Sequence, residues 1–288
     1  MRSDITVIVR TVGERTEDKC VEYLRRQFGN ENVSIVKNIT PFTEAIQKSF
    51  EIGMKKNKKW TFIIDADVFL MDSKIDIFLY TANEIEKNND RVFSIQPFVY
   101  DNFMLKSRLA GVHLYNTKYI EQACKYIGNN MLRPESFVIK SMNAEGYTAY
   151  KVYETIGVHD FFQRYEDIVA KGILHSKKHA NINELKEMWK KKEEESDFYW
   201  INQGCSIAEG ISIKDMKVDA EYIHGIIREK KLIFPDQKEL ANEEIDRVLK
   251  RYEHEVIYEI MQQGQVQQKK QNIIKRIIKK FYKMVLRG

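Results

Sequence analysis

The segment WTFIIDADVFLMD, residues 60–72, guides the interpretation of the whole chain, because an apolar run ends there in two carboxylates. Residues 60–64 are aromatic and β-branched, which predicts a buried strand, and Asp65 and Asp67 follow it with one residue between them. Such a pair can present oxygens to a divalent cation that also binds a diphosphate, since Mg²⁺ and Mn²⁺ prefer oxygen ligands. Alternatively, one Asp caps the following turn and the other is solvated.

The composition indicates a globular protein. A chain of 288 residues, 43% hydrophobic and 31% charged, can bury a sizeable core in one or two domains. Cys20, Cys124 and Cys205 are widely separated and odd in number, which is typical of reduced thiols in a cytoplasmic protein. The first residues, MRSDITVIVRT, lead directly into a strand-like run, so we expect no secretory signal peptide. No apolar run approaches the roughly 20 residues that would predict an integral membrane protein.

The net charge of +5 comes from the C-terminal tail. Eight basic residues and no acidic residue lie from Lys269 onward, and removing these eight from the 47 basic residues leaves 39 against 42 acidic ones, a net charge of −3. The body therefore does not have the charge of a nucleic-acid-binding protein. Residues 269–288 form a basic amphipathic pattern, which could lie in an anionic membrane interface or dock on the body or on a second subunit. The first alternative implies a peripheral enzyme at the inner face of a membrane.

Short β-branched runs alternate with segments of helical period. Strands are expected at residues 5–11, 33–39 and 60–64, and helices at residues 16–28 and 43–56. This alternation predicts an α/β fold with a mostly parallel sheet, in which ligands bind beyond the carboxyl ends of the strands. Asp65 and Asp67 would lie at one such end.

The order of elements continues downstream of the carboxylate pair. A helix is expected at 76–87, an extended segment at 91–99, a mixed segment at 109–114, a helix opened by Pro134 and Glu135 that runs to 144, and a strand at 147–153. After His179 the chain becomes charged and helical. We therefore expect a catalytic domain in residues 1–180 and a helical extension in residues 181–288.

Three separated blocks of sequence resemble family 2 glycosyltransferases of the GT-A fold. The blocks are VIVRTVGERT (residues 7–16), IIDADVF (residues 63–69) and PESFVIKSMNAEGYTAYKVYETIGVH (residues 134–159), and they occur in the family's order. The spacings from Glu135 to Tyr147 and from Tyr147 to His159 are both 12 residues and match the family's segment. The resemblance implies a Rossmann-like sheet and the transfer of a sugar from a nucleotide-sugar donor, most often UDP-linked, to a glycan or lipid-linked glycan acceptor.

The resemblance also implies roles for individual residues. Asp67 would be the main ligand of Mn²⁺ or Mg²⁺, Asp65 would contact the ribose or the metal, and His159 would complete the metal site through a neutral imidazole nitrogen. Glu135 falls at the position of the catalytic base of inverting members. The family usually has adjacent acids there, whereas Pro134 precedes Glu135 in this chain.

Further candidates are placed by position alone. Thr11 and Arg15 follow the first strand and could contact the nucleotide, although Arg15 could equally be solvated. Arg108 and His113 lie where such folds place acceptor contacts. The histidines have simpler alternatives: His159 could begin a helix that Asp160 caps, and His175 with His179 could form a metal or phosphate site or a basic surface turn.

Two other classes of protein remain open. IIDADVF also resembles the nucleophile motif of haloacid-dehalogenase-like phosphatases, in which Asp65 would attack phosphorus and Asp67 would act as acid and base. Two strand–helix units precede the motif, however, and no later GDxxxD-type pair of acids follows it. The third class is a non-catalytic protein that binds a sugar or a protein partner.

Overall fold

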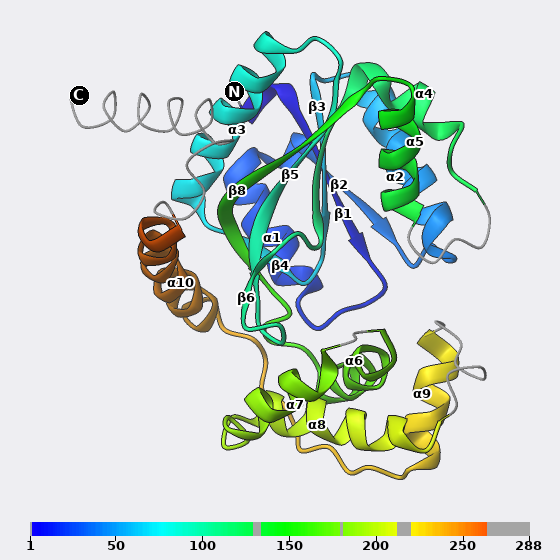
Figure 1. Cartoon of the computed structure of the whole chain (residues 1–288), viewed down its shortest axis with the longest axis vertical. Coiled ribbons are helices and arrows are strands. Elements are labelled where there is room, and N and C mark those ends of the chain that lie inside the picture. The colour runs from blue at the N-terminus through cyan, green and yellow to red at the C-terminus, as the bar shows by residue number, and fades with distance from the viewer. Residues whose placement is uncertain (1, 129–133, 179–180, 212–219, 264–288) are drawn as a thin grey trace. The chain divides into compact units, whose positions relative to one another are not determined.

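The computed structural model describes residues 2–128, 134–178, 181–211 and 220–263 (Figure 1). Contacts divide the chain into two compact units, a first made of residues 1–161 and 240–288 and a second made of residues 162–239. The division into domains 1–180 and 181–288 stays a prediction, since its boundary falls inside the second unit. His179 and the basic segment 269–288 lie outside the described residues.

An eight-stranded sheet forms the centre of the first unit. Its strands are β1 Ile5–Thr11, β2 Val33–Lys37, β3 Trp60–Asp65, β4 Val68–Leu70, β5 Val92–Asp101, β6 Lys106–Arg108, β7 Val112–Asn116 and β8 Thr148–His159. The order is β2-β1-β3-β7-β5-β8-β4, and β6 pairs with β5 outside this path. Strands β1, β2, β3, β5 and β8 run in one direction and β4, β6 and β7 in the other. The expected α/β fold with a mostly parallel, Rossmann-like sheet is confirmed.

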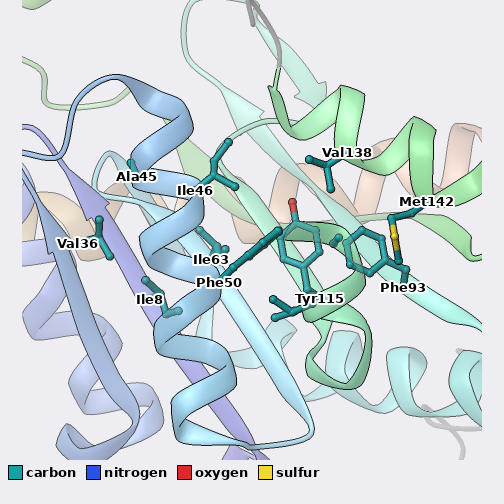
Figure 2. Close-up of a cluster of buried hydrophobic side chains, with 12 residues drawn as sticks. Ile8, Val36, Ala45, Ile46, Phe50, Ile63, Phe93, Tyr115, Val138 and Met142 are labelled. Atoms are coloured by element: carbon teal, nitrogen blue, oxygen red, sulfur yellow. The ribbon is translucent and has the colours of Figure 1, made fainter. Parts of the chain in front are cut away.

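Helices cover both faces of this sheet (Figure 1). They are α1 Glu17–Phe28, α2 Phe42–Lys56, α3 Asp72–Asn88, α4 Ile120–Cys124, α5 Pro134–Ala144 and α10 Asn242–Gln263. Ile8 and Ile63 point to the face covered by α2, α4 and α5, where they join the buried cluster drawn in Figure 2. Phe62 points the other way and packs against Phe28 of α1 and Phe78 of α3. Burial on both faces explains why β1 and β3 are continuous apolar runs rather than alternating ones.

Several elements differ from the expected ones: β2, for example, ends at Lys37 rather than at residue 39. Helix α3 begins at Asp72, directly after β4, rather than at residue 76. The mixed segment at 109–114 contains most of β7, which pairs antiparallel with β3. Strand β8 extends to His159, because β4 and β5 pair with its second half. The alternative in which His159 begins a helix is therefore wrong.

The second unit is helical. It contains α6 Tyr165–Lys178, α7 Ile182–Lys190, α8 Ser196–Glu209 and α9 Ala220–Glu229. Helices α6 and α8 approach closely at Gly172 and Gly204, where a Cβ on Gly172 would lie 2.3 Å from the carbonyl oxygen of Ile201. Across the part of the chain that the structure describes, no helix combines the length and the apolar character needed to cross a membrane.

Candidate functional site

The pairing of β1, β3, β4 and β8 brings the candidate residues together at one edge of the sheet. In the parallel pair of β1 and β3, Arg10 lies opposite Asp65, and the amide of Ala66 donates to the carbonyl of Arg10 at 3.0 Å. In the antiparallel pair of β4 and β8, Val68 lies opposite His159, which places Asp67 beside that histidine. The carboxyl ends of β1, β3 and β8 therefore meet around the DAD sequence, as expected for a ligand site in an α/β sheet.

Gly111 lies next to the DAD sequence at this edge of the sheet, at a position where only a glycine fits. Its carbonyl accepts a hydrogen bond from the amide of Asp65 at 2.8 Å, and its φ is +60°. A Cβ at this position would lie 2.8 Å from a methyl group of Val68 and 3.2 Å from the imidazole of His159. Glycine adopts positive φ without steric cost, so the backbone at Gly111 can lie in close contact with Val68 and His159.

Asp67, His159 and Asp160 form a cluster that could hold a metal ion. One ligand atom from each of the three residues lies within 4.8 Å of the others. His159 Nε2 is 3.5 Å from Asp67 Oδ1, and His159 Nδ1 is 3.2 Å from Asp160 Oδ2. Two carboxylates and one imidazole are ligands that suit Mn²⁺ and, through the oxygens, Mg²⁺. Asp160, expected to cap a helix, is instead a third candidate ligand, because it directly follows His159.

Asp101 at the end of β5 orients His159. Its carboxylate is fully buried and accepts hydrogen bonds from the amides of Phe103 and Met104 and from Arg108 Nε at 2.6 Å. His159 Nδ1 lies 3.0 Å from Asp101 Oδ2. Burial raises the pKa of Asp101, but His159 and Arg108 outweigh it, and the pKa lies well below its usual range. An ionised Asp101 favours the tautomer with a proton on Nδ1, which leaves Nε2 free to act as a ligand on the Asp67 side.

Arg108 forms an ion pair with Asp101 in this structure. The contact with the acceptor that was predicted for Arg108 stays a prediction. His113 of β7 lies in a second cluster, 3.3 Å from Glu135 Oε2 and 3.2 Å from the side-chain nitrogen of Gln96. Its role as an acceptor contact is likewise untested.

Arg10, which was not among the residues expected from the sequence, lies at the centre of the second cluster. The Arg10 guanidinium is 4% exposed, and its Nη2 lies 2.7 Å from Asp65 Oδ1 while its Nη1 lies 2.8 Å from Glu135 Oε1. The structure therefore joins the first acid of the DAD sequence to the predicted catalytic base through one side chain. A charged residue inside the apolar run ITVIVRT was the signal that could have revealed it.

This arrangement sets the protonation of both acids. Burial raises the pKa of Glu135, but Arg10 and His113 lower it further than burial raises it, so the pKa lies well below its usual value. Burial also raises the pKa of Asp65, and Glu135 and Asp67 add to this effect while Arg10 opposes it. Glu135 is therefore firmly ionised at neutral pH, and a carboxylate with such a low pKa is a weak base.

A cleft of about 210 Å³ leads to the DAD sequence. Its walls combine apolar and polar side chains: Arg10, Thr11, Val12, Glu14, Val36, Ile39, Phe42, Ala45, Asp65, Asp67 and His159. The Thr11 hydroxyl lies 2.6 Å from Glu14 Oε2 and 2.8 Å from Glu17 Oε2, so two carboxylates compete for its single proton. Arg15, from the same loop, is outside the set of lining residues. A cleft whose walls combine apolar side chains with a few charged groups is typical of a small-molecule site.

Comparisons with known proteins concern the fold. No protein-family model matches this chain, and a search of curated proteins gave no match either. Matching solved structures include the following three. A glycosyltransferase involved in glycosylation of the major capsid of PBCV-1 is 12% identical, with a TM-score of 0.39, and the match covers 56% of this chain and 96% of that chain. A197 from STIV is 11% identical, with a TM-score of 0.38, and the match covers 56% of this chain and 87% of that chain. A cytidylyltransferase from Leptospira borgpetersenii is 15% identical, with a TM-score of 0.38, and the match covers 66% of this chain and 95% of that chain. At these identities the similarity concerns the fold alone.

Proposed function

We propose that this chain is a metal-dependent glycosyltransferase that moves a sugar from a nucleoside-diphosphate donor, UDP-linked, to a hydroxyl of a glycan or lipid-linked glycan. The observation that carries the proposal is the meeting of Asp65, Asp67 and His159 where β3 and β8 end, beside a cleft that Thr11 also lines. Carboxylates and an imidazole around a cleft of this kind are the groups that bind a cation and a diphosphate together.

Asp67, His159 and Asp160 would hold Mn²⁺ or Mg²⁺ in this proposal. The donor set fits, because it combines anionic oxygens with an imidazole whose other nitrogen faces Asp101. When bound, the cation would stabilise the negative charge that develops on the departing diphosphate. Asp65, whose Oδ1 is paired with Arg10, keeps its proposed contact with the ribose or with the metal.

Glu135 is the proposed base for the acceptor hydroxyl. Its side chain is 15% exposed and ionised, so it can accept a proton. Arg10 and His113 hold it in a fixed place next to the cleft. The same neighbours weaken it as a base, so transfer requires the acceptor to bind within hydrogen-bond reach of this carboxylate.

The phosphatase alternative assigns the nucleophile to Asp65. Arg10 Nε and Nη2 both contact the same oxygen of Asp65, at 2.9 and 2.7 Å. These contacts occupy that oxygen and hold the carboxylate in place, so only Oδ2 would be left to attack phosphorus. The arrangement therefore favours the transferase over the phosphatase.

Calorimetry with the full chain tests the proposal. Wild-type protein should bind UDP only with Mn²⁺ or Mg²⁺ present, and it should hydrolyse one member of a panel of nucleotide sugars in the presence of the metal. Asp67→Ala should abolish the metal-dependent binding of UDP, whereas Asp72→Ala, at a position whose side chain is 71% exposed, should leave it unchanged. Turnover of p-nitrophenyl phosphate without hydrolysis of any nucleotide sugar would establish the phosphatase instead, and no activity in either assay would favour the binding protein.

A further inference from the structure

We propose that Arg10 is a positioning residue that fixes the Glu135 carboxylate for proton acceptance and ties its place to that of Asp65. The inference rests on the proposed function, because it assigns Arg10 a part in the same reaction.

The first argument is the geometry of the guanidinium. Arg10 projects from β1 with its side chain 4% exposed, and its nitrogens contact Asp65 Oδ1 at 2.7 and 2.9 Å and Glu135 Oε1 at 2.8 Å. The planar fork of an arginine fixes the directions of its donors, so two acids bound to one guanidinium are also fixed relative to each other. Asp65 follows from β3 and Glu135 from the first turn of α5, 70 residues later in the chain. Arg10 is thus a direct link between the donor side and the base.

The second argument is the location of this link. Arg10, Asp65 and Asp67 all line the cleft, and the Arg10 guanidinium lies 4.7 Å from the centre of the Phe42 ring. A buried arginine carries a large desolvation cost, which paired acids must offset. If stability were the only role, an apolar residue in β1 would serve as well, since Ile8 and Val9 are fully buried next to it.

The third argument concerns what would hold Glu135 without Arg10. His113 would remain, with Nε2 3.3 Å from Glu135 Oε2, but it also faces Gln96 at 3.2 Å. The groups that face Glu135 are Arg10 from β1 and His113 from β7, with Asp65 and Tyr115 nearby. Without Arg10 the carboxylate would lose its only shared contact with Asp65 among the described residues. Its orientation would then depend on a single histidine.

The test is a double-mutant cycle on metal-dependent hydrolysis of the active nucleotide sugar, with water as the acceptor. Arg10→Gln should lower kcat about 100-fold, since misplacement of a reacting group by about 1 Å can cost this much. In the Glu135→Gln background the same change should have no further effect. Arg10→Lys should recover part of the activity, because lysine supplies the charge but not the fork. Arg2→Gln is the matched control, since Arg2 also binds two acids, Asp72 and Asp76, outside the cleft.

A second readout does not depend on the reaction. Carbon-13 NMR of the Glu135 carboxylate should show that it titrates at higher pH in Arg10→Gln than in wild type, since the charge of Arg10 lowers this pKa. Equal effects of Arg10→Gln on kcat with and without Glu135, or an unchanged Glu135 titration, would overturn the inference. Absence of UDP binding and of hydrolysis in wild type would instead refute the proposed function, and the titration alone would then decide whether Arg10 controls Glu135.

Discussion

Single residues in this site act through their neighbours, and Asp101 is the clearest case. Asp101 does not line the cleft itself, yet it accepts four hydrogen bonds, one of them from Nδ1 of the cleft residue His159. Groups that orient a metal ligand in this way typically change metal affinity when they are replaced.

Asp101→Asn should therefore weaken Mn²⁺ binding about 10- to 100-fold, because the amide no longer selects the Nδ1-protonated tautomer of His159. Calorimetric titration of the metal into the variant measures the effect. Arg108→Lys keeps a positive charge next to Asp101 and serves as the control, with a smaller loss. Equal affinity in Asp101→Asn and wild type would show that His159 needs no such orientation.

Glu135 should also give the protein a characteristic pH dependence of stability. Its folded-state pKa is depressed below the ordinary value of 4.5, so its contribution to stability is present above about pH 4.5 and is lost as the pH falls through the folded-state pKa. Urea unfolding of wild type and Glu135→Gln should thus differ at pH 7, and the difference should shrink below about pH 4. A difference that stays constant from pH 7 to pH 3 would contradict the ion pair with Arg10.

The sequence revealed part of this site and missed the rest for a physical reason. The sequence identified Asp65, Asp67, His159 and Glu135, because they lie in short motifs with a fixed spacing along the chain. The structure brings the first three to one cleft. Arg10 and Asp101 act through partners more than 50 residues away. Such pairings depend on sheet register, which no local pattern in one sequence determines.

At the scale of elements, the crossing of α6 and α8 in the second unit depends on two glycines. A Cβ on Gly204 would lie 2.2 Å from the carbonyl oxygen of Val169, and one on Gly172 would lie 2.3 Å from that of Ile201. The two helix backbones therefore touch directly, without side chains between them.

Gly172→Ala should destabilise the second unit by about 1–3 kcal/mol, because the added methyl group forces the helices apart. Gly210→Ala is the matched control, since a Cβ there meets its nearest atom at 3.8 Å and the backbone is right-handed. Urea unfolding followed by the fluorescence of Trp189 and Trp200, both buried in this unit, measures the change. An equal stability of the two variants would show that the helices can separate without cost.

The elements themselves were largely predictable. Strands at 5–11 and 60–64 and helices at 16–28 and 43–56 agree with β1, β3, α1 and α2 within about one residue at each end. The strand predicted at 147–153 was too short. The second half of β8 is extended because it pairs with β4 and β5, and not because its residues show a strand-like pattern. Tertiary pairing overrides local preference at such places.

At the scale of the whole molecule, the last described helix belongs to the first unit. Tyr23 of α1 donates to Asp246 of α10 at 2.7 Å, and Tyr252 of α10 packs on Tyr100 and Phe161. The charged amphipathic pattern after residue 180 predicted helices but not the elements against which they pack. Such a pattern does not specify what the apolar face of a helix covers.

The segment 269–288 is proposed to bind an anionic membrane at its cytoplasmic side. Deleting it removes eight basic residues, each worth about 1 kcal/mol near an anionic surface. The full chain should sediment with phosphatidylglycerol vesicles, and the shortened chain should not. Binding of UDP with Mn²⁺ by the shortened chain is the control for folding. If the full chain ignores the vesicles but forms a dimer that the deletion abolishes, the segment contacts a second subunit instead.

The return of α10 to the first unit has a consequence for biosynthesis. The second unit interrupts the first between residues 161 and 240, so both of its ends are joined to the same body. A ribosome must therefore release all of the intervening helices before Tyr23 can meet Asp246. Until that moment, the nascent sheet has Tyr100 and Phe161 without the cover of Tyr252. Completion of the first unit thus waits until the ribosome has released α10.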